Sequence, residues 1–430
     1  MPTLKTVTLG CKVNQYETEY LRQGFLQLGY RDAEENAPAD LYIFNTCTVT
    51  HQADAECRKI LRRLARENPA GEIIVMGCYA TKAADRVRQF PGVSEVVTDK
   101  RRMAEVLAKR GLVHVPTGIS QFARRHRAYV KVQDGCFLPC SYCIIPQVRP
   151  EVWSRPVPEI EEEVRRLVDS GYREVVLTGV HLGLFGHDRP RGERIDLAGL
   201  AERLIAVRDG FRIRLSSLEV NEVSDRLVAL MAAYPDRVCP HLHIPLQSGS
   251  PEVLRRMRRR ASMEYFFERC ARVQEMLPLP ALSTDAMVGF PGETDADFEA
   301  TCRAVERIGF VKVHVFRFSP REGTPAADMP DQVPEEIKRE RARRLDETAQ
   351  QSRRRYISRL LDTEVQVLLE DETDLTAPIC PNRVLGMSDR YVPTALPAGD
   401  GKPGDLVSVR LTGWDGEFLH GSVLAANRCV

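Results

Sequence analysis

The chain has 430 residues, with 61 Lys and Arg against 60 Asp and Glu, so its formal net charge is +1. This length predicts roughly three domains of about 150 residues, and the balanced charge excludes any assignment of a partner from the overall electrostatic field. No stretch of about 18 apolar residues and no apolar signal segment is present, which predicts a cytoplasmic enzyme with no membrane partner. In that reducing compartment, the 12 cysteines are expected to be thiols or metal ligands and not disulfides.

The first hundred residues alternate between strand and helix patterns. Apolar runs with turn signals between them predict strands, and apolar residues at helical spacing predict the connecting helices. This alternation is typical of an α/β unit with a mostly parallel sheet. The strand patterns cover residues 3–9, 41–46, 73–77 and 95–98, and the helical patterns include 17–28 and 53–67.

A cysteine follows each of the first three predicted strands. These residues are Cys11, Cys47 and Cys78. Because the carboxyl ends of parallel strands meet at one edge of a sheet, where such folds bind ligands, the three thiols are expected to converge. They would then be either the ligands of a cluster or three separately buried cysteines.

A second group of cysteines lies in a short loop after the next predicted strand. Cys136, Cys140 and Cys143 have the spacing C-x3-C-x2-C, and the aromatic Tyr142 precedes the last of them. Three thiolates can hold three irons of a four-iron cluster, and no fourth cysteine follows at ferredoxin-like spacing, so one iron is left open for a substrate. The alternatives are an unrelated trio of thiols or a zinc site, although zinc prefers four ligands and C-x2-C pairs.

From about residue 127 the alternation resumes with a longer period. Six β/α units predict a partial (β/α)6 barrel whose carboxyl-edge loops carry the chemistry. A charged helical pattern at 334–361 leads to short strands with Gly and Pro turns, which predict a small β-barrel. The strand patterns of the first part cover 128–133, 174–178, 212–215, 242–245, 281–288 and 311–316, and those of the last part cover 364–369, 390–395, 406–411 and 418–424.

Six short motifs occur in order beside the cysteine loop. They are Leu-Gly-Cys-Lys-Val-Asn-Gln-Tyr-Glu-Thr (9–18), Asn-Thr-Cys-Thr-Val-Thr (45–50), Gly-Cys-Tyr-Ala (77–80), Thr-Gly-Val-His-Leu-Gly (178–183), Pro-Leu-Gln-Ser-Gly-Ser (245–250) and Gly-Phe-Pro-Gly-Glu-Thr (289–294). With these motifs the chain resembles the methylthiotransferases of the radical S-adenosylmethionine superfamily over nearly its whole length. The resemblance implies an N-terminal cluster domain at 1–120, a radical domain at 121–358 and a C-terminal TRAM β-barrel at 359–430.

The resemblance also implies the cofactors and partners. Two [4Fe-4S] clusters are expected, one on Cys11, Cys47 and Cys78 and the radical cluster on Cys136, Cys140 and Cys143. S-adenosylmethionine then serves twice, first as methyl donor to a sulfur held at the first cluster and then as the source of a deoxyadenosyl radical at the second. The implied partners are the anticodon arm of tRNA, an electron donor of flavodoxin or ferredoxin type, and a sulfur source.

The wording of the first two motifs bears on the substrate. It resembles the branch that acts on N6-threonylcarbamoyladenosine at position 37 of tRNA, with C2 of the base as the target. C2 of adenine is an aromatic C–H position that no general base deprotonates usefully, so the reaction calls for a radical and for an extruded base. The alternatives are the branch for prenylated adenosine, which usually reads Cys-Gln-Met-Asn, the branch for a ribosomal-protein aspartate, which reads Cys-Pro-Lys-Asn, and a non-catalytic RNA-binding protein that keeps the clusters.

Contacts to the cofactor and to RNA are assigned from the resemblance and from charge. The expected cofactor-binding residues, each of which could instead be ordinary strand-end packing, are Tyr142, Thr178, Gly179, Arg214, Ser216, Glu219, Gln247, Asp285 and Val288. Arg149, Trp153 and Arg155 are expected to contact RNA, since they could combine phosphate binding with stacking. Basic runs at 58–66, 124–127, 255–260 and 353–355 are further candidates. From residue 362 onward, five basic residues stand against eleven acidic ones, so the last domain alone is a poor electrostatic anchor.

Overall fold

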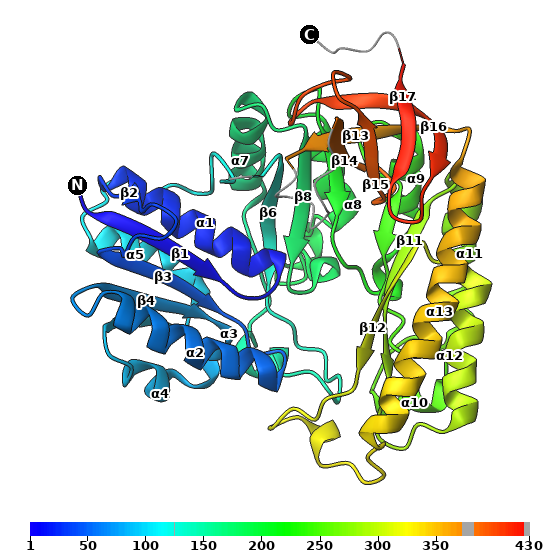
Figure 1. The fold of residues 1–430 in the computed structure, drawn as a ribbon, viewed down its shortest axis with the longest axis horizontal. Coiled ribbons are helices and arrows are strands. Elements are labelled where there is room, and N and C mark those ends of the chain that lie inside the picture. Colours follow the sequence, from blue (N-terminus) through cyan, green and yellow to red (C-terminus); the bar gives the residue numbers. More distant parts are fainter. Residues whose placement is uncertain (124, 372–381, 425–430) are drawn as a thin grey trace.

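The structure is a computed structural model that describes residues 1–123, 125–371 and 382–424. Arg124, Cys380 and Cys429 therefore lie outside the described residues. Figure 1 shows an N-terminal α/β unit beside a central β/α barrel, and a smaller β-barrel packed against one end of the central barrel. Among the described residues, no helix has the length and apolar character needed to span a membrane.

The N-terminal unit is built around a parallel sheet with the strand order β2-β1-β3-β4-β5. Strand β3, with the sequence Leu-Tyr-Ile-Phe-Asn-Thr, is buried along its whole length, as expected for a central strand that is covered on both faces. The predicted parallel α/β unit is thus confirmed. Its elements are β1 (Thr3–Thr8), α1 (Lys12–Gln27), β2 (Arg31–Asp32), β3 (Leu41–Thr46), α2 (His51–Glu67), β4 (Glu72–Gly77), α3 (Cys78–Lys82), α4 (Ala84–Arg88), β5 (Val93–Val97) and α5 (Met103–Lys109).

The central unit contains the expected β/α alternation. Its strands form two sheets, ordered β7-β6-β8-β9 and β10-β11-β12, which are joined through a parallel bridge between Ile213 and Val238. The strands are β6 (Arg127–Asp134), β7 (Trp153–Ser154), β8 (Glu174–Gly179), β9 (Arg212–Leu215), β10 (His241–His243), β11 (Ala281–Val288) and β12 (Lys312–Arg317). Apart from the antiparallel edge strand β7, the paired strands are parallel, which confirms the predicted partial barrel.

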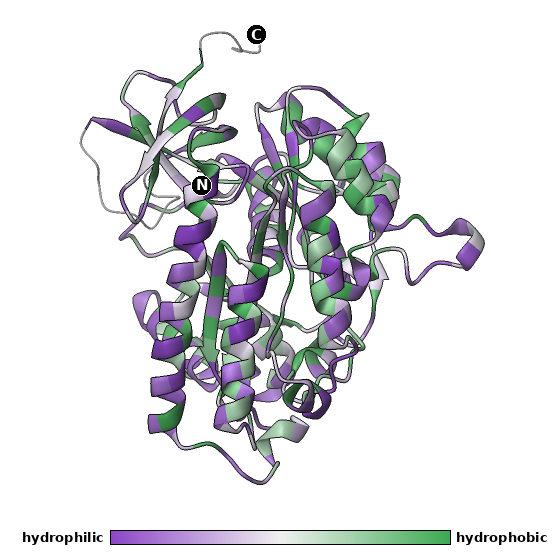
Figure 2. Ribbon diagram, turned by 90° about the vertical axis from the view of Figure 1, so that its right-hand side faces the viewer, coloured by the Kyte–Doolittle hydropathy of each residue, from purple (hydrophilic) through white to green (hydrophobic). Residues whose placement is uncertain are grey.

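Helices cover the outside of this barrel. They are α7 (Val157–Asp169), α8 (Leu197–Ile205), α9 (Asp225–Ala233), α10 (Pro251–Arg256), α11 (Met263–Met276), α12 (Asp295–Ile308) and α13 (Glu335–Leu360). The short helix α6 (Ile145–Val148) instead follows the cysteine loop and packs against α3 of the N-terminal unit. Figure 2 shows that the outer helices carry hydrophilic and hydrophobic residues on different stripes, as amphipathic helices packed on a core do. Local signals set their ends: Thr294 and Asp297 form a capping box before α12, and Gly309 ends it in a left-handed conformation.

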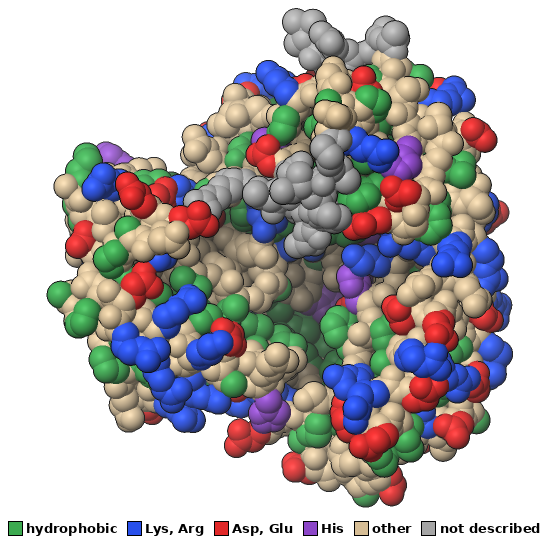
Figure 3. Space-filling view, viewed as in Figure 1, with side chains coloured by type: hydrophobic (Ala, Val, Ile, Leu, Met, Phe, Trp, Pro, Cys, Tyr) green, Lys and Arg blue, Asp and Glu red, His purple; other side chains and the backbone are tan. Residues whose placement is uncertain are grey.

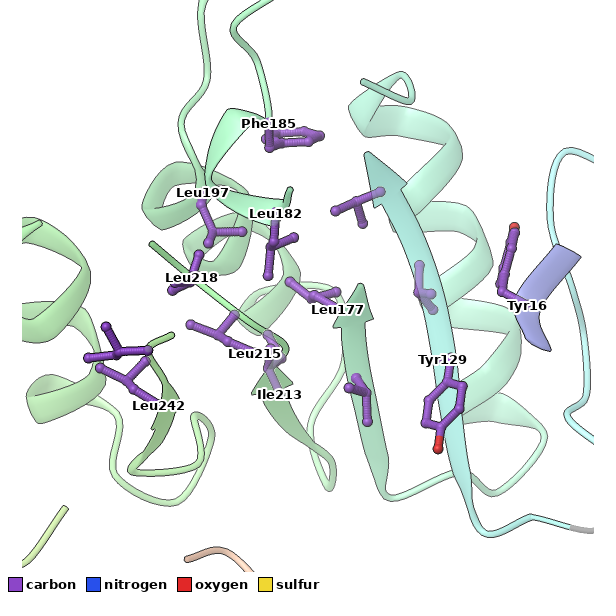
Figure 4. Packing of buried hydrophobic residues seen from close by; sticks show 14 of the residues in the cluster. Tyr16, Tyr129, Leu177, Leu182, Phe185, Leu197, Ile213, Leu215, Leu218 and Leu242 are labelled. Carbon is purple, nitrogen blue, oxygen red and sulfur yellow. The ribbon is translucent and has the colours of Figure 1, made fainter. Parts of the chain in front are cut away.

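One continuous cluster of buried hydrophobic side chains extends through both the N-terminal unit and the barrel. Figure 4 shows Leu177, Ile213 and Leu215 from neighbouring barrel strands packed together, with Tyr16 of the N-terminal helix α1 on the far side of β6. Truncating such a buried leucine to alanine costs about 2–5 kcal/mol. The shared core therefore fixes the position of the N-terminal unit on the barrel.

Within the described residues, five strands of the C-terminal part close into a barrel with the order β13-β14-β15-β17-β16. They are β13 (Glu364–Glu370), β14 (Arg383–Ser388), β15 (Pro393–Pro397), β16 (Leu406–Trp414) and β17 (Leu419–Val423). The predicted small barrel is confirmed, but β14 was missed and β15 was placed too early. β14 was missed because Gly386 reads as a turn residue in the sequence. In β14, a Cβ on this residue would lie 2.6 Å from the Leu368 carbonyl oxygen, so glycine permits close approach of the two strands.

Candidate active site

The strand order of the N-terminal sheet brings three cysteines to one edge. Cys11, Cys47 and Cys78 follow β1, β3 and β4, which are adjacent strands. Gly10 has φ +111°, and a Cβ on it would lie 3.4 Å from the Sγ atom of Cys47, so this turn needs glycine to bring the two thiols together. Burial raises the pKa of the Cys47 thiol, and the nearby Cys78 and Cys11 thiols raise it further.

The second trio lies in the loop after β6, at the carboxyl end of the first barrel strand. The buried side chain of Gln133 shapes this loop: its amide donates to the carbonyl oxygens of Asp134 and Gly135 at 2.6 and 2.7 Å. Its Oε1 atom accepts from the backbone N–H of His181, 2.8 Å away, which joins the loop to the end of β8. The Cys136 N–H donates to the Arg149 carbonyl oxygen at 3.0 Å. The cysteine loop is therefore held by the barrel before any ligand binds.

The environment of the thiols bears on what they could hold. Burial raises the pKa of Cys143 to about 12, and the neighbouring Cys140 and Cys136 thiols add to this shift. A free thiol in this place stays protonated at neutral pH, so the thiolate form requires a strong positive partner such as bound metal. The chemistry of three converging thiols fits iron.

The spacing of the thiols is wider than a single zinc ion requires. Tetrahedral zinc with bonds of about 2.3 Å would bring its sulfur ligands within about 4 Å of one another. Among the described residues, neither cysteine trio places its sulfur atoms within 4.8 Å of one another; the group that meets this limit is His243, Asp285 and His314. Wider spacing fits a cluster, because each thiolate binds a different iron atom.

His181 lies beside the loop that carries Cys136, Cys140 and Cys143. The sequence alone did not single out this histidine. Its Nδ1 atom lies 3.6 Å from the Sγ atom of Cys136, and its Nε2 atom lies 3.3 Å from a carboxylate oxygen of Glu222. Burial lowers the pKa of His181, but the contacts with Cys136 and Glu222 raise it to about 9. The imidazole thus holds a positive charge beside this thiol. The signal was its place in the Thr-Gly-Val-His motif at the end of β8.

A buried polar seam joins the N-terminal unit to the barrel near the first trio. The guanidinium of Arg149 donates to Glu17 and Asp134, both at 2.8 Å, and its Nε atom donates to the Sγ atom of Cys78 at 3.4 Å. Lys131 pairs with the same two carboxylates. The positive charges of Arg149 and Lys131 balance the negative charges of Glu17 and Asp134. The Cys78 thiol is an additional group that adds no charge while it is protonated.

This burial corrects part of the expected RNA interface. Arg149 and Arg155 were expected to bind RNA phosphates, but both are 5% exposed. Arg155 pairs with Glu163 at 2.5 Å and donates to the Tyr16 hydroxyl at 3.0 Å. Both guanidinium groups are satisfied between the two units and have no free face for a phosphate. Trp153 is half-buried, with the Lys131 ammonium 5.9 Å from its ring centre.

A cavity of about 560 Å³ lies between the N-terminal unit and the barrel strands. Figure 3 shows the molecular surface hollowed between these two parts, with histidine side chains visible in the hollow. Cys11 is exposed to solvent here, although the surrounding protein still raises the pKa of its thiol. The side chains that line it include Cys11, Lys12, Ser216, His243, Asp285 and His314.

The expected cofactor-binding residues separate into two groups. Arg214, Ser216 and Asp285 line the cavity. Arg214, however, is 2% exposed and pairs with Glu174 at 2.8 Å, and its guanidinium also donates to the carbonyl oxygens of Ser388 and Asp389. The expectation for Arg214 is therefore corrected: its guanidinium anchors the C-terminal barrel and is not free for a ligand.

The other expected cofactor residues lie at strand ends and near the cysteine loop. Thr178 and Gly179 end β8, Val288 ends β11, and Gln247 has φ +65° and is bridged to Ala286 of β11. Glu219 pairs with Arg259, with 2.7 Å between Oε1 and Nη1, beside Cys140. Tyr142 packs against the core, and its burial raises the pKa of its hydroxyl.

Two side chains on β12, His314 and Phe316, were also missed by the sequence argument. They line the same cavity as His243, which lies 3.3 Å from Asp285. The available signal was the alternation of His314 and Phe316 at positions i and i+2 of β12, which places both on one face of the strand.

Comparisons with known proteins agree with this geometry. Residues 130–305 match the Radical SAM superfamily and residues 3–99 match the Uncharacterized protein family UPF0004. The chain is 36% identical to the threonylcarbamoyladenosine tRNA methylthiotransferase MtaB of Bacillus subtilis, over 96% of this chain and 94% of that protein. It is 37% identical to the MtaB of Thermotoga maritima, over 86% of this chain and 87% of the relative.

Two further similarities are more distant. A tRNA-2-methylthio-N(6)-dimethylallyladenosine synthase of Agrobacterium fabrum is 32% identical over 94% of each chain. Among solved structures, the radical S-adenosylmethionine methyltransferase TsrM of Kitasatospora setae matches with a TM-score of 0.57 and 14% identity, over 76% of this chain and 75% of that one. At that sequence identity, the structural similarity supports the fold alone.

Proposed function

Because the chain belongs to the tRNA methylthiotransferase family of radical S-adenosylmethionine enzymes, we propose that it transfers a methylthio group to C2 of N6-threonylcarbamoyladenosine at position 37 of tRNA. The family implies a [4Fe-4S] cluster and S-adenosylmethionine. The observation that carries the proposal is that Cys11 opens into a cavity that also holds Ser216 and Asp285 from the barrel. A base in this cavity would have residues of both units within reach.

The choice of nucleoside rests on two supports. The motif Cys-Lys-Val-Asn follows the wording of the threonylcarbamoyladenosine branch, and relatives with that name are 32–37% identical to the chain, against 32% for the relative named for the prenylated base. The product is then 2-methylthio-N6-threonylcarbamoyladenosine.

The proposed ligand sets follow the two trios. Cys136, Cys140 and Cys143 hold the radical cluster, and Cys11, Cys47 and Cys78 hold a second [4Fe-4S] cluster. When bound, the clusters and S-adenosylmethionine supply the one-electron chemistry and the methylthio group. The chain's own part is to position the cysteine ligands and to exclude water. The Gln133 side chain fixes the conformation of the cysteine loop, and Arg149 keeps a permanent positive charge beside Cys78.

Cofactor binding is assigned to strand ends that face the cysteine loop or the cavity. We assign these contacts to Tyr142, Thr178, Gly179, Ser216, Glu219, Gln247, Asp285 and Val288. Domain boundaries near 120 and 358 are proposed on the same footing. The separate N-terminal sheet and the closed C-terminal barrel support this division.

The anticodon arm of tRNA needs a basic surface. Arg62, Arg63 and Arg66 are exposed on α2, and among the described residues they form no ion pair with a carboxylate. Figure 3 shows basic side chains gathered on the side of the N-terminal unit where Figure 1 places α2. We propose this helix as one contact for the RNA. An electron donor of flavodoxin or ferredoxin type and a sulfur source complete the set of partners.

The proposal is tested by mass spectrometry of tRNA nucleosides from a host strain that lacks its own enzyme. The strain carries the intact gene, the Cys136→Ala variant or no gene. Appearance of 2-methylthio-N6-threonylcarbamoyladenosine with the intact gene alone supports the proposal. Methylthiolation of the prenylated base or of a ribosomal-protein aspartate overturns the choice of substrate. Absence of any methylthio product, with iron loaded, favours a non-catalytic RNA-binding protein.

A further inference from the structure

Lys12 follows Cys11 directly and is the first residue of α1. It is half-buried and lines the cavity between the N-terminal unit and the barrel. Its ammonium forms no hydrogen bond or ion pair with any other residue in the described part of the chain. Most other buried cations here are paired, as Arg149, Arg155 and Arg214 are. An unpaired lysine that faces a cavity is available to bind an anion.

The remaining charges of the cavity balance one another, so they do not cancel the charge of Lys12. Asp285 is the carboxylate on the wall, and His243 lies 3.3 Å from it and hydrogen-bonds Ser283 at 3.1 Å. Arg127 and Arg214 also line the cavity and are paired with Glu370 and Glu174. The second of these carboxylates is shared with Arg212, so three arginines balance Glu174, Glu370 and Asp285, and the ammonium of Lys12 is the positive charge in excess.

Tyr391 reports on the resulting potential. Burial would raise the pKa of its hydroxyl, yet the surrounding positive charges of Lys12, Arg127, Arg214 and Lys312 lower it below the usual value. The tyrosine lies on the wall of the cavity. Its environment is therefore electropositive.

The opposite wall offers groups for the rest of a nucleoside. Phe316 is 50% exposed on β12, so its ring can pack against a base. Burial lowers the pKa of His314, and nearby Lys312 lowers it further, so this imidazole is neutral at pH 7 and can donate or accept a hydrogen bond. A volume of about 560 Å³ is within the range of small-ligand sites.

We propose that Lys12 is a specificity-determining residue whose ammonium binds the carboxylate of the N6-threonylcarbamoyl group, with Phe316 and His314 on the opposite wall. This inference rests on the proposed function and adds the residue that reads the substrate's charge. A prenyl group carries no charge, so it would leave the ammonium without a partner. A cavity that contains an unpaired lysine therefore selects the acidic nucleoside over the apolar one.

The test uses the cluster-loaded protein and two anticodon stem-loops. One contains N6-threonylcarbamoyladenosine at position 37, and the other contains its methyl ester, which removes the negative charge and keeps the shape. Dissociation constants are measured by fluorescence anisotropy for the wild type, Lys12→Gln and Lys12→Arg. A charge-assisted hydrogen bond predicts that the wild type binds the acid about 10- to 100-fold more tightly than the ester. Lys12→Gln should bring the ratio close to one, and Lys12→Arg should restore much of it.

Lys312→Gln is the matched control, because Lys312 contributes positive charge nearby but does not line the cavity. This variant should keep the wild-type ratio, and iron content should be the same in all proteins. A wild-type ratio of one, an unchanged ratio in Lys12→Gln, or an equal loss in both variants would each overturn the inference. If the wild type forms 2-methylthio-N6-threonylcarbamoyladenosine but Lys12→Gln keeps its ratio, the inference alone fails. Modification of the prenylated base instead would show that the proposed function has failed.

Discussion

The Nε atom of Arg149, in the barrel, donates a hydrogen bond to the Sγ atom of Cys78, in the N-terminal unit, at 3.4 Å. Burial opposes the charge on Arg149, but Asp134 and Glu17 raise its pKa well above the usual value, so the guanidinium stays charged. A permanent cation beside a proposed cluster ligand stabilises added negative charge. If Cys78 holds the proposed second cluster, Arg149 would therefore help to set the potential of that cluster.

Replacing Arg149 by Gln should make the midpoint potential of that cluster more negative. Loss of one charge-assisted hydrogen bond corresponds to about 60 mV for a one-electron couple. A redox titration followed by electron paramagnetic resonance measures this shift. Arg155→Gln is the control, because Arg155 is equally buried but pairs with Glu163 and contacts no cysteine among the described residues. Equal potentials in the wild type and Arg149→Gln would contradict the prediction.

The carboxylate of Glu174 anchors the C-terminal barrel through two buried arginines. It pairs with Arg212 at 2.7 Å and Arg214 at 2.8 Å, and both arginines donate to backbone carbonyls of the barrel. Glu174→Gln leaves these cations partly uncompensated and should reduce the free energy of unfolding by about 3–5 kcal/mol. Urea unfolding in a Trp153→Phe background measures this, since Trp414 then reports on β16. Glu161→Gln, which breaks a surface pair with Arg203, should cost about 0–1 kcal/mol.

The same carboxylate predicts a pH dependence. Burial alone would raise the pKa of Glu174, but Arg214 and Arg212 lower it well below the usual 4.5. A carboxyl group with a lower pKa in the folded state stabilises the fold above its unfolded pKa, and this contribution disappears as the pH falls toward the folded value. The wild type should thus lose stability below about pH 4.5, and the difference between wild type and Glu174→Gln should shrink over that range. A constant difference from pH 7 to pH 3 would argue against the assignment.

The exposed arginines of α2 predict a salt-dependent RNA contact. Changing Arg62, Arg63 and Arg66 together to Ala should weaken binding of tRNA and reduce the slope of log K against log salt by about two to three. Filter binding at several salt concentrations provides this slope. Changing Arg339, Arg343 and Arg344 on α13 to Ala is a control with the same charge change, since these three arginines already pair with glutamates. Equal loss of affinity in both triple variants would contradict a specific role for α2.

The iron content of the protein distinguishes a chain with two clusters from a chain with one. The proposed ligand sets predict about eight irons per reconstituted chain, and Cys11→Ser and Cys136→Ser should each lose about four. Cys270→Ser, which changes a buried cysteine of α11, should retain all of them. Loss of all iron from both ligand variants would show a single shared cluster instead.

Much of the fold could be predicted because its signals are local. The strand patterns and the cysteines that follow Thr8, Thr46 and Gly77 required only apolar periodicity and the rule that parallel strands end at one edge. β14 could not be found this way, because Gly386 is explained by its contact with Leu368 on the neighbouring strand β13. Packing between the two strands, which the local sequence pattern does not contain, requires glycine at that position.

The candidate site shows the same division. Cysteine spacing indicated both trios, but the roles of the arginines depended on partners far away in the chain. Arg149 meets Glu17, 132 residues earlier, and Arg214 meets the carbonyl of Asp389, 175 residues later. Charge next to a motif could not reveal that these cations are already satisfied. Lys12 is the opposite case, since its lack of a partner appears only when the whole cavity is described.

The buried seam at the first trio has a consequence for recombination between relatives. Its carboxylate Glu17 and its amide Asn14 come from the N-terminal unit, whereas Lys131, Asp134 and Arg149 come from the barrel. A chimaera that takes the N-terminal unit from one parent and the barrel from another inherits half of this network from each. The crossover succeeds when both halves match, so these five positions must be exchanged as a set when new methylthiotransferases are assembled from parts.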